Sequence, residues 1–166
     1  MAASGFFPPD ARVELIDGLV YDMTPQSSGH TTSVHLAAEA LRPAFPGSYL
    51  RVQSPLALGE RSAPEPDVAV VTGSPRDYRD SHPSTALLVV EVADASLLHD
   101  RKRKLPLYAA AGIPEAWILN FKQKALEVYR NPVDGEYRSR TVLRAGESVS
   151  PLSGPGISIG IADLLP

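Results

Sequence analysis

Two acidic residues lie at the ends of apolar runs, where a charged side chain is unexpected. Asp67 follows Pro66 and opens the run 68–71, and Glu91 lies near the end of the run 86–92. A carboxylate in such a run costs free energy unless it is paired, hydrogen-bonded or bound to a metal ion. If the runs form neighbouring strands, Mg²⁺ (or Mn²⁺) would relieve the repulsion between the carboxylates, because Mg²⁺ takes oxygen ligands and keeps bound water. The alternative is that each carboxylate accepts hydrogen bonds from backbone amides at a strand end.

A lysine is the third group that such a site needs. A nuclease with a Glu-x-Lys motif would carry it at position 93, on the same strand face as Glu91, but this chain has Ala93. Lys104, in the charged segment 100–104, has a stem long enough to reach the space beside Glu91, and Lys102 is its competitor. Such a lysine would stabilise charge on a phosphate or orient the attacking water. The commoner interpretation of a charged segment is a solvated helix start.

The first element that must position these residues is a hairpin over 12–23. Asp17-Gly18 between two apolar stretches is a strong hairpin signal. Strand alternation places Glu14 and Ile16 on one face, the polar one, and Val13 and Leu15 on the other.

The remaining elements follow from apolar periodicity and from turn residues. A helix is predicted from about 30 to 45, capped by Ser27 or Ser28. Further predicted elements are strands over 49–58, 67–71, 86–92, 116–119 and 157–161, a helix near 104–111, and a hairpin of 126–130 with 137–143. This order predicts an α/β (or α+β) fold with a mixed β-sheet flanked by helices, an N-terminal β-hairpin and a C-terminal antiparallel hairpin. The length suits one domain over 1–166.

Two polar residues outside the main set have both a functional and a structural interpretation. Gln53 would face the same side as Arg51 and could touch the site or a phosphate, although an exposed strand residue is the simpler interpretation. His30 could hold a substrate phosphate or simply help to cap the helix, and we favour the capping role.

The second predicted helix carries residues that need no catalytic role. Tyr108 lies one turn after Lys104 and could steer it, but a core position is the simpler interpretation. Asp100 is interpreted as the helix N-cap. Asp94 is left out of the candidate site, and Trp117 is expected in the core.

Composition excludes several classes of protein. The chain has no cysteine, which excludes disulfide scaffolds and thiolate metal sites. The net charge of −3 argues against a standing basic surface for nucleic acid. The histidines lack zinc spacing, and no apolar run reaches the ~18 residues of a membrane span, so no membrane partner is expected. No basic and apolar leader is recognisable, and we expect a cytoplasmic protein.

An ordered series of short motifs covers nearly the whole chain and resembles the Uma-two family of restriction endonuclease-like proteins. The motifs are Val13-Glu14-Leu15-Ile16-Asp17-Gly18, His30, Gln53-Ser54-Pro55-Leu56, Pro66-Asp67-Val68-Ala69-Val70, Val90-Glu91-Val92-Ala93-Asp94, the segment 100–104, Leu107-Tyr108-Ala109, Gly112-Ile113-Pro114-Glu115 and Trp117-Ile118. The resemblance implies the PD-(D/E)XK nuclease fold, with Asp67 and Glu91 as metal ligands. It also implies a lysine displaced to the next helix, which matches Lys104, and it adds Glu14 as a further acidic residue near the site.

These observations support two hypotheses. In the first, the chain is a Mg²⁺-dependent endonuclease that hydrolyses DNA, with Arg101, Lys102 and Arg103 contacting the DNA backbone. Because one small monomer makes one cut, cleavage of both strands would favour a homodimer. In the second, the chain is a catalytically inactive nuclease-fold module that binds nucleic acid or protein. The acidic net charge and the missing in-line lysine favour the second hypothesis.

Overall fold

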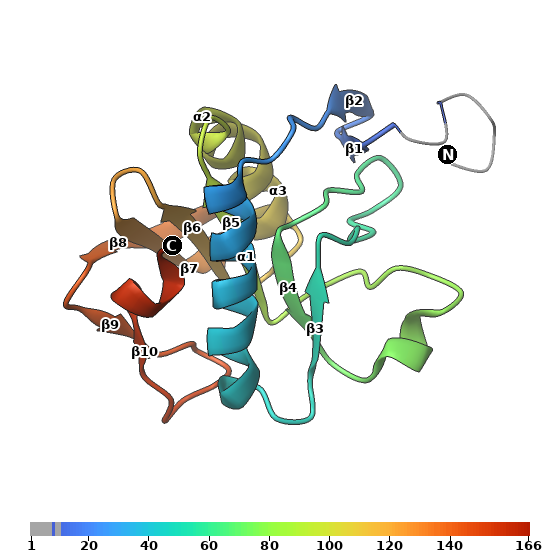
Figure 1. Cartoon of the computed structure of the whole chain (residues 1–166). Helices are drawn as coiled ribbons and strands as arrows, with labels where there is room; N and C mark the ends of the chain where they lie inside the picture. The colour runs from blue at the N-terminus through green and yellow to red at the C-terminus, as the bar shows by residue number, and fades with distance from the viewer. Residues whose placement is uncertain (1–7, 9–10) are drawn as a thin grey trace.

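The computed structural model describes residue 8 and residues 11–166, and its centre is a six-stranded sheet with the order β3-β4-β5-β6-β7-β8 (Figure 1). The strands are β3 (Tyr49–Val52), β4 (Val68–Val71), β5 (Leu88–Ala93), β6 (Glu115–Asn120), β7 (Ala125–Val133) and β8 (Glu136–Arg144). Only the β5–β6 pair is parallel within this sheet, so the mixed sheet predicted from the sequence is confirmed.

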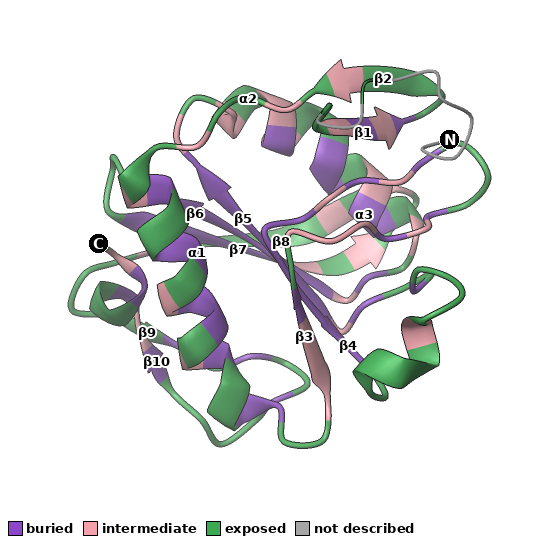
Figure 2. Cartoon of the chain, turned by 45° about the vertical axis from the view of Figure 1, so that its right-hand side comes forward, coloured by how far each residue is buried: buried purple, intermediate pink, exposed green. Residues whose placement is uncertain are grey.

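Helices cover both faces of the sheet. Helix α1 (Ser28–Leu41) packs on one face, and a helical segment composed of α2 (Leu97–His99), a π-helical turn (Asp100–Lys104) and α3 (Leu105–Ala110) packs on the other. Neighbouring residues of β5 point to opposite layers, since Val90 belongs to the core under α1 and Val89 to the core under α3. A sheet that is covered on both faces explains why β4, β5 and β6 are buried along their whole length (Figure 2).

An N-terminal hairpin of β1 (Val13–Ile16) and β2 (Leu19–Asp22) lies outside the main sheet. Asp17 and Gly18 form its turn with φ angles of 52° and 81°, as a type I′ turn requires. The hairpin docks on the following loop through an isolated bridge between Leu15 and Ala63. The predicted polar face is wrong, because docking buries Glu14 and Ile16 and leaves the opposite face partly exposed.

The strand predicted over 49–58 is shorter than expected. It ends at Val52, because Gln53 adopts a left-handed φ of 46° and turns the chain. Within the strand Arg51 is buried and donates to the carbonyl oxygen of Pro55, whereas Val52 is exposed.

The helix predicted near 104–111 begins earlier, at Leu97. Asp100 therefore lies inside the helical segment and is not its N-cap, which corrects the prediction. In the π-helical turn the N–H of Leu105 donates to the carbonyl of Asp100, five residues back. Pro106 follows directly, where it has no N–H to continue the pattern.

The C-terminal part confirms the predicted hairpin and adds a second small one. Asp134 and Gly135 connect β7 and β8 with positive φ angles. The last predicted strand is reduced to β10 (Ile159–Gly160), which pairs with the unpredicted β9 (Ser148–Val149). Among the helices of the described residues, none combines the length and apolar composition that crossing a bilayer requires.

Candidate functional site

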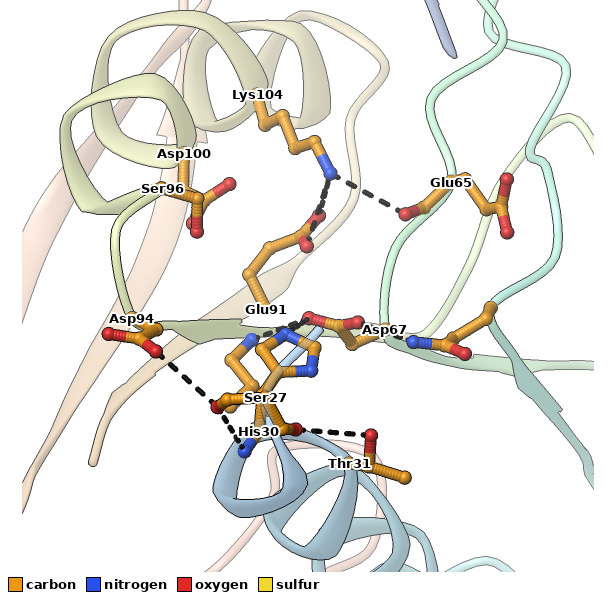
Figure 3. Close-up of polar contacts among 12 residues, drawn as sticks. Ser27, His30, Thr31, Glu65, Asp67, Glu91, Asp94, Ser96, Asp100 and Lys104 are labelled. Atoms are coloured by element: carbon orange, nitrogen blue, oxygen red, sulfur yellow. Dashed lines mark hydrogen bonds and ion pairs between the residues drawn. The ribbon is translucent and has the colours of Figure 1, made fainter. Parts of the chain in front are cut away.

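A pocket of about 330 Å³ lies where the N-terminal hairpin, the start of α1, the end of β5 and the π-helical turn meet. All four residues singled out in the sequence line it: Glu14, Asp67, Glu91 and Lys104. Figure 3 shows the Lys104 side chain extending from its helix toward Glu91, with Asp67 nearby.

Strand register explains why Asp67 and Glu91 meet. The antiparallel ladder pairs Val68 of β4 with Val90 of β5. Asp67 and Glu91 are the next positions along this ladder, so their side chains leave the same face of the sheet. Residues 24 positions apart in the sequence are thereby neighbours in space.

The Asp67 carboxylate is held by three protein groups. Its Oδ2 accepts a hydrogen bond from the N–H of Val92 at 2.8 Å and lies 3.3 Å from Nε2 of His30. Its Oδ1 accepts from the side-chain amide of Gln53 at 3.2 Å. Burial raises the pKa of Asp67, but the hydrogen bonds and the His30 ring outweigh it and lower the pKa below its usual range. Asp67 is therefore an anion at neutral pH.

Glu91 is more deeply buried and has two partners. The hydroxyl of Tyr108 donates to Oε1 at 2.5 Å, and Nζ of Lys104 lies 3.2 Å from each carboxylate oxygen. Burial raises the pKa of Glu91 well above its usual range, and the ammonium of Lys104 opposes this effect. The neighbouring negative charges of Asp100 and Asp67 raise the pKa of Glu91 further.

Lys104 lies between two carboxylates. Its Nζ is 3.1 Å from Oε2 of Glu14, besides the contacts with Glu91, and it donates to the carbonyl of Glu65 at 3.4 Å. Burial lowers the pKa of Lys104, but Glu91 and Glu14 outweigh it and raise the pKa above its usual range. The competing Lys102 is exposed, so the structure brings Lys104 and not Lys102 into the pocket.

The π-helical turn decides which residues of the charged segment face inward. Asp100 and Lys104 are buried, whereas Lys102 and Arg103 are exposed. The alternative interpretation, a solvated helix start, therefore describes Lys102 and Arg103 but not Lys104. Arg101 donates through Nε to the buried carboxylate of Glu127 at 3.1 Å, which ties the turn to β7.

Residues 2–162 match the model of a family described as "Putative restriction endonuclease". The chain belongs to the Uma2 family. This is the Uma-two family that the motif series resembled, so that prediction is confirmed. No curated protein matches the chain.

A solved structure supports the fold of this Uma2 family member. This chain is similar to the crystal structure of a protein from Anabaena variabilis that is described as "a putative nuclease belonging to DUF820", with a TM-score of 0.73 and 14% sequence identity. The similarity covers 93% of this chain and 90% of that chain. At this identity the similarity concerns the fold, and the nuclease-like fold class that we expected is confirmed.

Two residues of this Uma2 family member lie closer to the site than the sequence indicated. Ser27 is the N-cap of α1, because its hydroxyl oxygen accepts from the backbone N–H of His30 at 3.2 Å. The His30 side chain does not have the capping role that we favoured, and its ring contacts Asp67. His30 shares the buried face of α1 with Val34 and Leu41, which is the signal that could have indicated an inward side chain. Gln53, for which an exposed position was favoured, contacts Asp67.

Other residues of the pocket had no clear signal in the sequence. Nε2 of His99 lies 3.1 Å from Oε1 of Glu14. Asp100 lines the pocket and accepts from the hydroxyl of Ser96 at 2.8 Å. Asp94, which we left out, lines the rim and pairs with Lys122.

Proposed function

We propose that this Uma2 family member is a metal-dependent endonuclease that hydrolyses phosphodiester bonds in DNA. One observation carries the proposal: Asp67, Glu91 and Lys104 come from a loop, a strand and a π-helical turn and converge in one pocket. The printed descriptions of the family, "Putative restriction endonuclease", and of the similar protein from Anabaena variabilis, "a putative nuclease", support the same chemistry here.

The acidic pocket suits a divalent cation. Its lining includes seven carboxylates: Glu14, Asp22, Glu65, Asp67, Glu91, Asp94 and Asp100. Residue 8 and residues 11–166 contain no group of three or more His, Cys, Asp or Glu side chains arranged to hold a metal ion. The pair Asp67 and Glu91 would supply the carboxylate oxygens of a Mg²⁺ (or Mn²⁺) site, because such an ion is commonly held by one or two carboxylates, several waters and substrate phosphate oxygens. When bound, such an ion neutralises phosphate charge and acidifies a bound water.

Other residues of the pocket would orient the two carboxylates and stabilise charge on the phosphate. His30, Gln53 and the N–H of Val92 orient the Asp67 carboxylate, and Tyr108 orients Glu91. Lys104 carries a positive charge that would stabilise charge developing on the phosphate.

DNA contacts outside the pocket would come from the exposed part of the charged segment. Lys102 and Arg103 are free to contact phosphates, whereas the guanidinium of Arg101 is engaged by Glu127. Cleavage of both strands would require a second active site, and we propose a two-fold homodimer on symmetry grounds.

A second candidate function is a module that binds nucleic acid or protein without cleaving it. The observation in its favour is that protein groups already contact all four oxygens of Asp67 and Glu91. A metal ion would have to replace some of these contacts.

Calorimetric titration of Mg²⁺ and Mn²⁺, combined with plasmid nicking on the same samples, separates the two functions. Under the nuclease proposal the wild type binds the ion and nicks, and Asp67→Asn and Glu91→Ala lose both properties. The exposed His35→Ala serves as the control that retains both. Absence of ion binding and nicking in the wild type would reject the nuclease and favour the binding module. Unchanged ion affinity in Asp67→Asn would reject the ligand assignment.

A further inference from the structure

Both oxygens of the Glu14 carboxylate contact side chains of the helical segment 97–110. Nε2 of His99 lies 3.1 Å from Oε1, and Nζ of Lys104 lies 3.1 Å from Oε2. Because a carboxylate only accepts hydrogen bonds, Nε2 of His99 carries the hydrogen in this contact. The N–H of Glu65 also donates to Oε2 at 3.3 Å. These three contacts together fix the orientation of the Glu14 carboxylate.

The π-helical turn allows both His99 and Lys104 to contact Glu14. His99 and Lys104 are five residues apart, and in a regular α-helix residues at that spacing point about 140° away from each other. The turn over Asp100–Lys104 closes with a hydrogen bond to the fifth residue, which brings the two positions nearly one above the other. Both side chains thereby reach one carboxylate.

The hairpin holds His99 from a second direction. Tyr21 is the cross-strand partner of Glu14 in the hairpin. The rings of Tyr21 and His99 meet edge to face, with centroids 5.0 Å apart and an interplanar angle of 63°. A single rotamer of His99 therefore contacts both Glu14 and Tyr21, which are neighbours across the hairpin.

We infer that His99 is a positioning residue that acts through Glu14 to fix the ammonium group of Lys104 between Glu14 and Glu91. The distances of 3.1 Å and 3.2 Å from Nζ to these carboxylates are balanced. If Glu14 loses its anchor, Nζ is drawn to Glu91, the deeper carboxylate, and away from the place where a phosphate would bind. The inference rests on the proposed nuclease function, because it assigns Lys104 the task of meeting the phosphate.

The test compares His99→Ala with His99→Gln, whose side-chain amide can donate to Oε1 of Glu14 in place of Nε2. We expect His99→Ala to lower kcat for Mg²⁺-dependent DNA cleavage about 10- to 100-fold with little change in KM. His99→Gln should recover most of this loss, and His35→Ala should behave as the wild type. A fall that is equal in both His99 variants and follows the loss of folded protein would overturn the inference.

A second measurement needs no cleavage. The ¹³Cε and ¹⁵Nζ NMR signals of Lys104 report the surroundings of its ammonium group in the free protein. They should shift in His99→Ala and stay close to the wild type in His99→Gln. Unmoved Lys104 signals in His99→Ala would reject the positioning role. If the wild type does not cleave DNA while the Lys104 signals shift as expected, the nuclease proposal fails and the positioning role stands.

Discussion

The hydroxyl of Tyr108 lies 2.5 Å from Oε1 of Glu91, and both side chains are buried. The substitution Tyr108→Phe removes this donor and leaves the rest of the ring in the core. Because a buried acceptor then loses a partner, we expect the free energy of unfolding to fall by about 1–3 kcal/mol. Urea denaturation measures the difference. Tyr78→Phe is the control, since its hydroxyl bonds an exposed carbonyl, and it should change stability much less. Equal effects in the two variants would contradict the proposed strength of the Tyr108 contact.

Lys104 and Lys102 should differ sharply in a matched pair of substitutions. Lys104→Met leaves the buried carboxylates of Glu14 and Glu91 without their cation, which typically costs about 3–5 kcal/mol of stability. Lys102→Met changes an exposed side chain and should stay within about 0.5 kcal/mol of the wild type. Equilibrium unfolding in urea gives both values. A Lys104→Met protein as stable as the Lys102→Met protein would show that the buried ion pairs contribute little.

Magnesium should stabilise the folded protein through Asp67. An ion at ten times its dissociation constant adds about 1.4 kcal/mol to the free energy of unfolding. Scanning calorimetry should therefore give a higher Tm in Mg²⁺ than in a chelator, and Asp67→Asn should abolish the difference. Asp94→Asn is the matched control at the pocket rim, where the carboxylate pairs with Lys122, and it should keep the difference. A Tm increase that persists in Asp67→Asn would mean that the ion binds elsewhere.

The buried Glu127 should make stability depend on pH in the acidic range. Burial raises the pKa of Glu127, but hydrogen bonds from Arg101 and Tyr129 outweigh it and lower the pKa below its usual range. A lowered pKa stabilises the fold above the unfolded-state value of about 4.3, and the stabilisation disappears as pH falls through the folded-state pKa. The stability difference between wild type and Glu127→Gln should be constant above about pH 5.5 and shrink below about pH 4.3. Urea denaturation at a series of pH values provides the test, and a difference that grows with acidification would contradict it.

Local patterns were sufficient to predict most of the fold. The Asp17-Gly18 turn, the Ser27 cap and the apolar runs of the sheet each contain their signal within a few residues. Asp67 and Glu91 could be selected because a carboxylate beside an apolar run has an obvious energetic cost. Such signals need no knowledge of the rest of the chain.

The errors concern features that depend on distant contacts. The buried face of the hairpin is decided by its docking on 61–65, so alternation alone misassigned Glu14. Helix α2 begins without a side-chain cap, so the sequence gives no signal for its start at Leu97, and the helix was predicted only near 104–111 with Asp100 as its cap. The contact of His30 with Asp67 joins residues from different layers of the fold. The helical spacing of His30 with Val34 and Leu41 indicates an inward side chain, but it does not indicate that Asp67 is the partner.

The single parallel pair, β5 with β6, limits how the chain can change in length. Parallel neighbours need a crossover connection, and the crossover here spans 94–114 and carries Lys104 and Tyr108. Deleting one residue within the helical stretch 97–103 would rotate the lysine by about 100° relative to the start of that stretch and remove it from the pocket. The turn at Asp134 and Gly135 joins antiparallel strands away from the pocket, where an insertion would leave the site intact. Variation in length among functional relatives should therefore be concentrated in that turn and be absent from the start of the crossover.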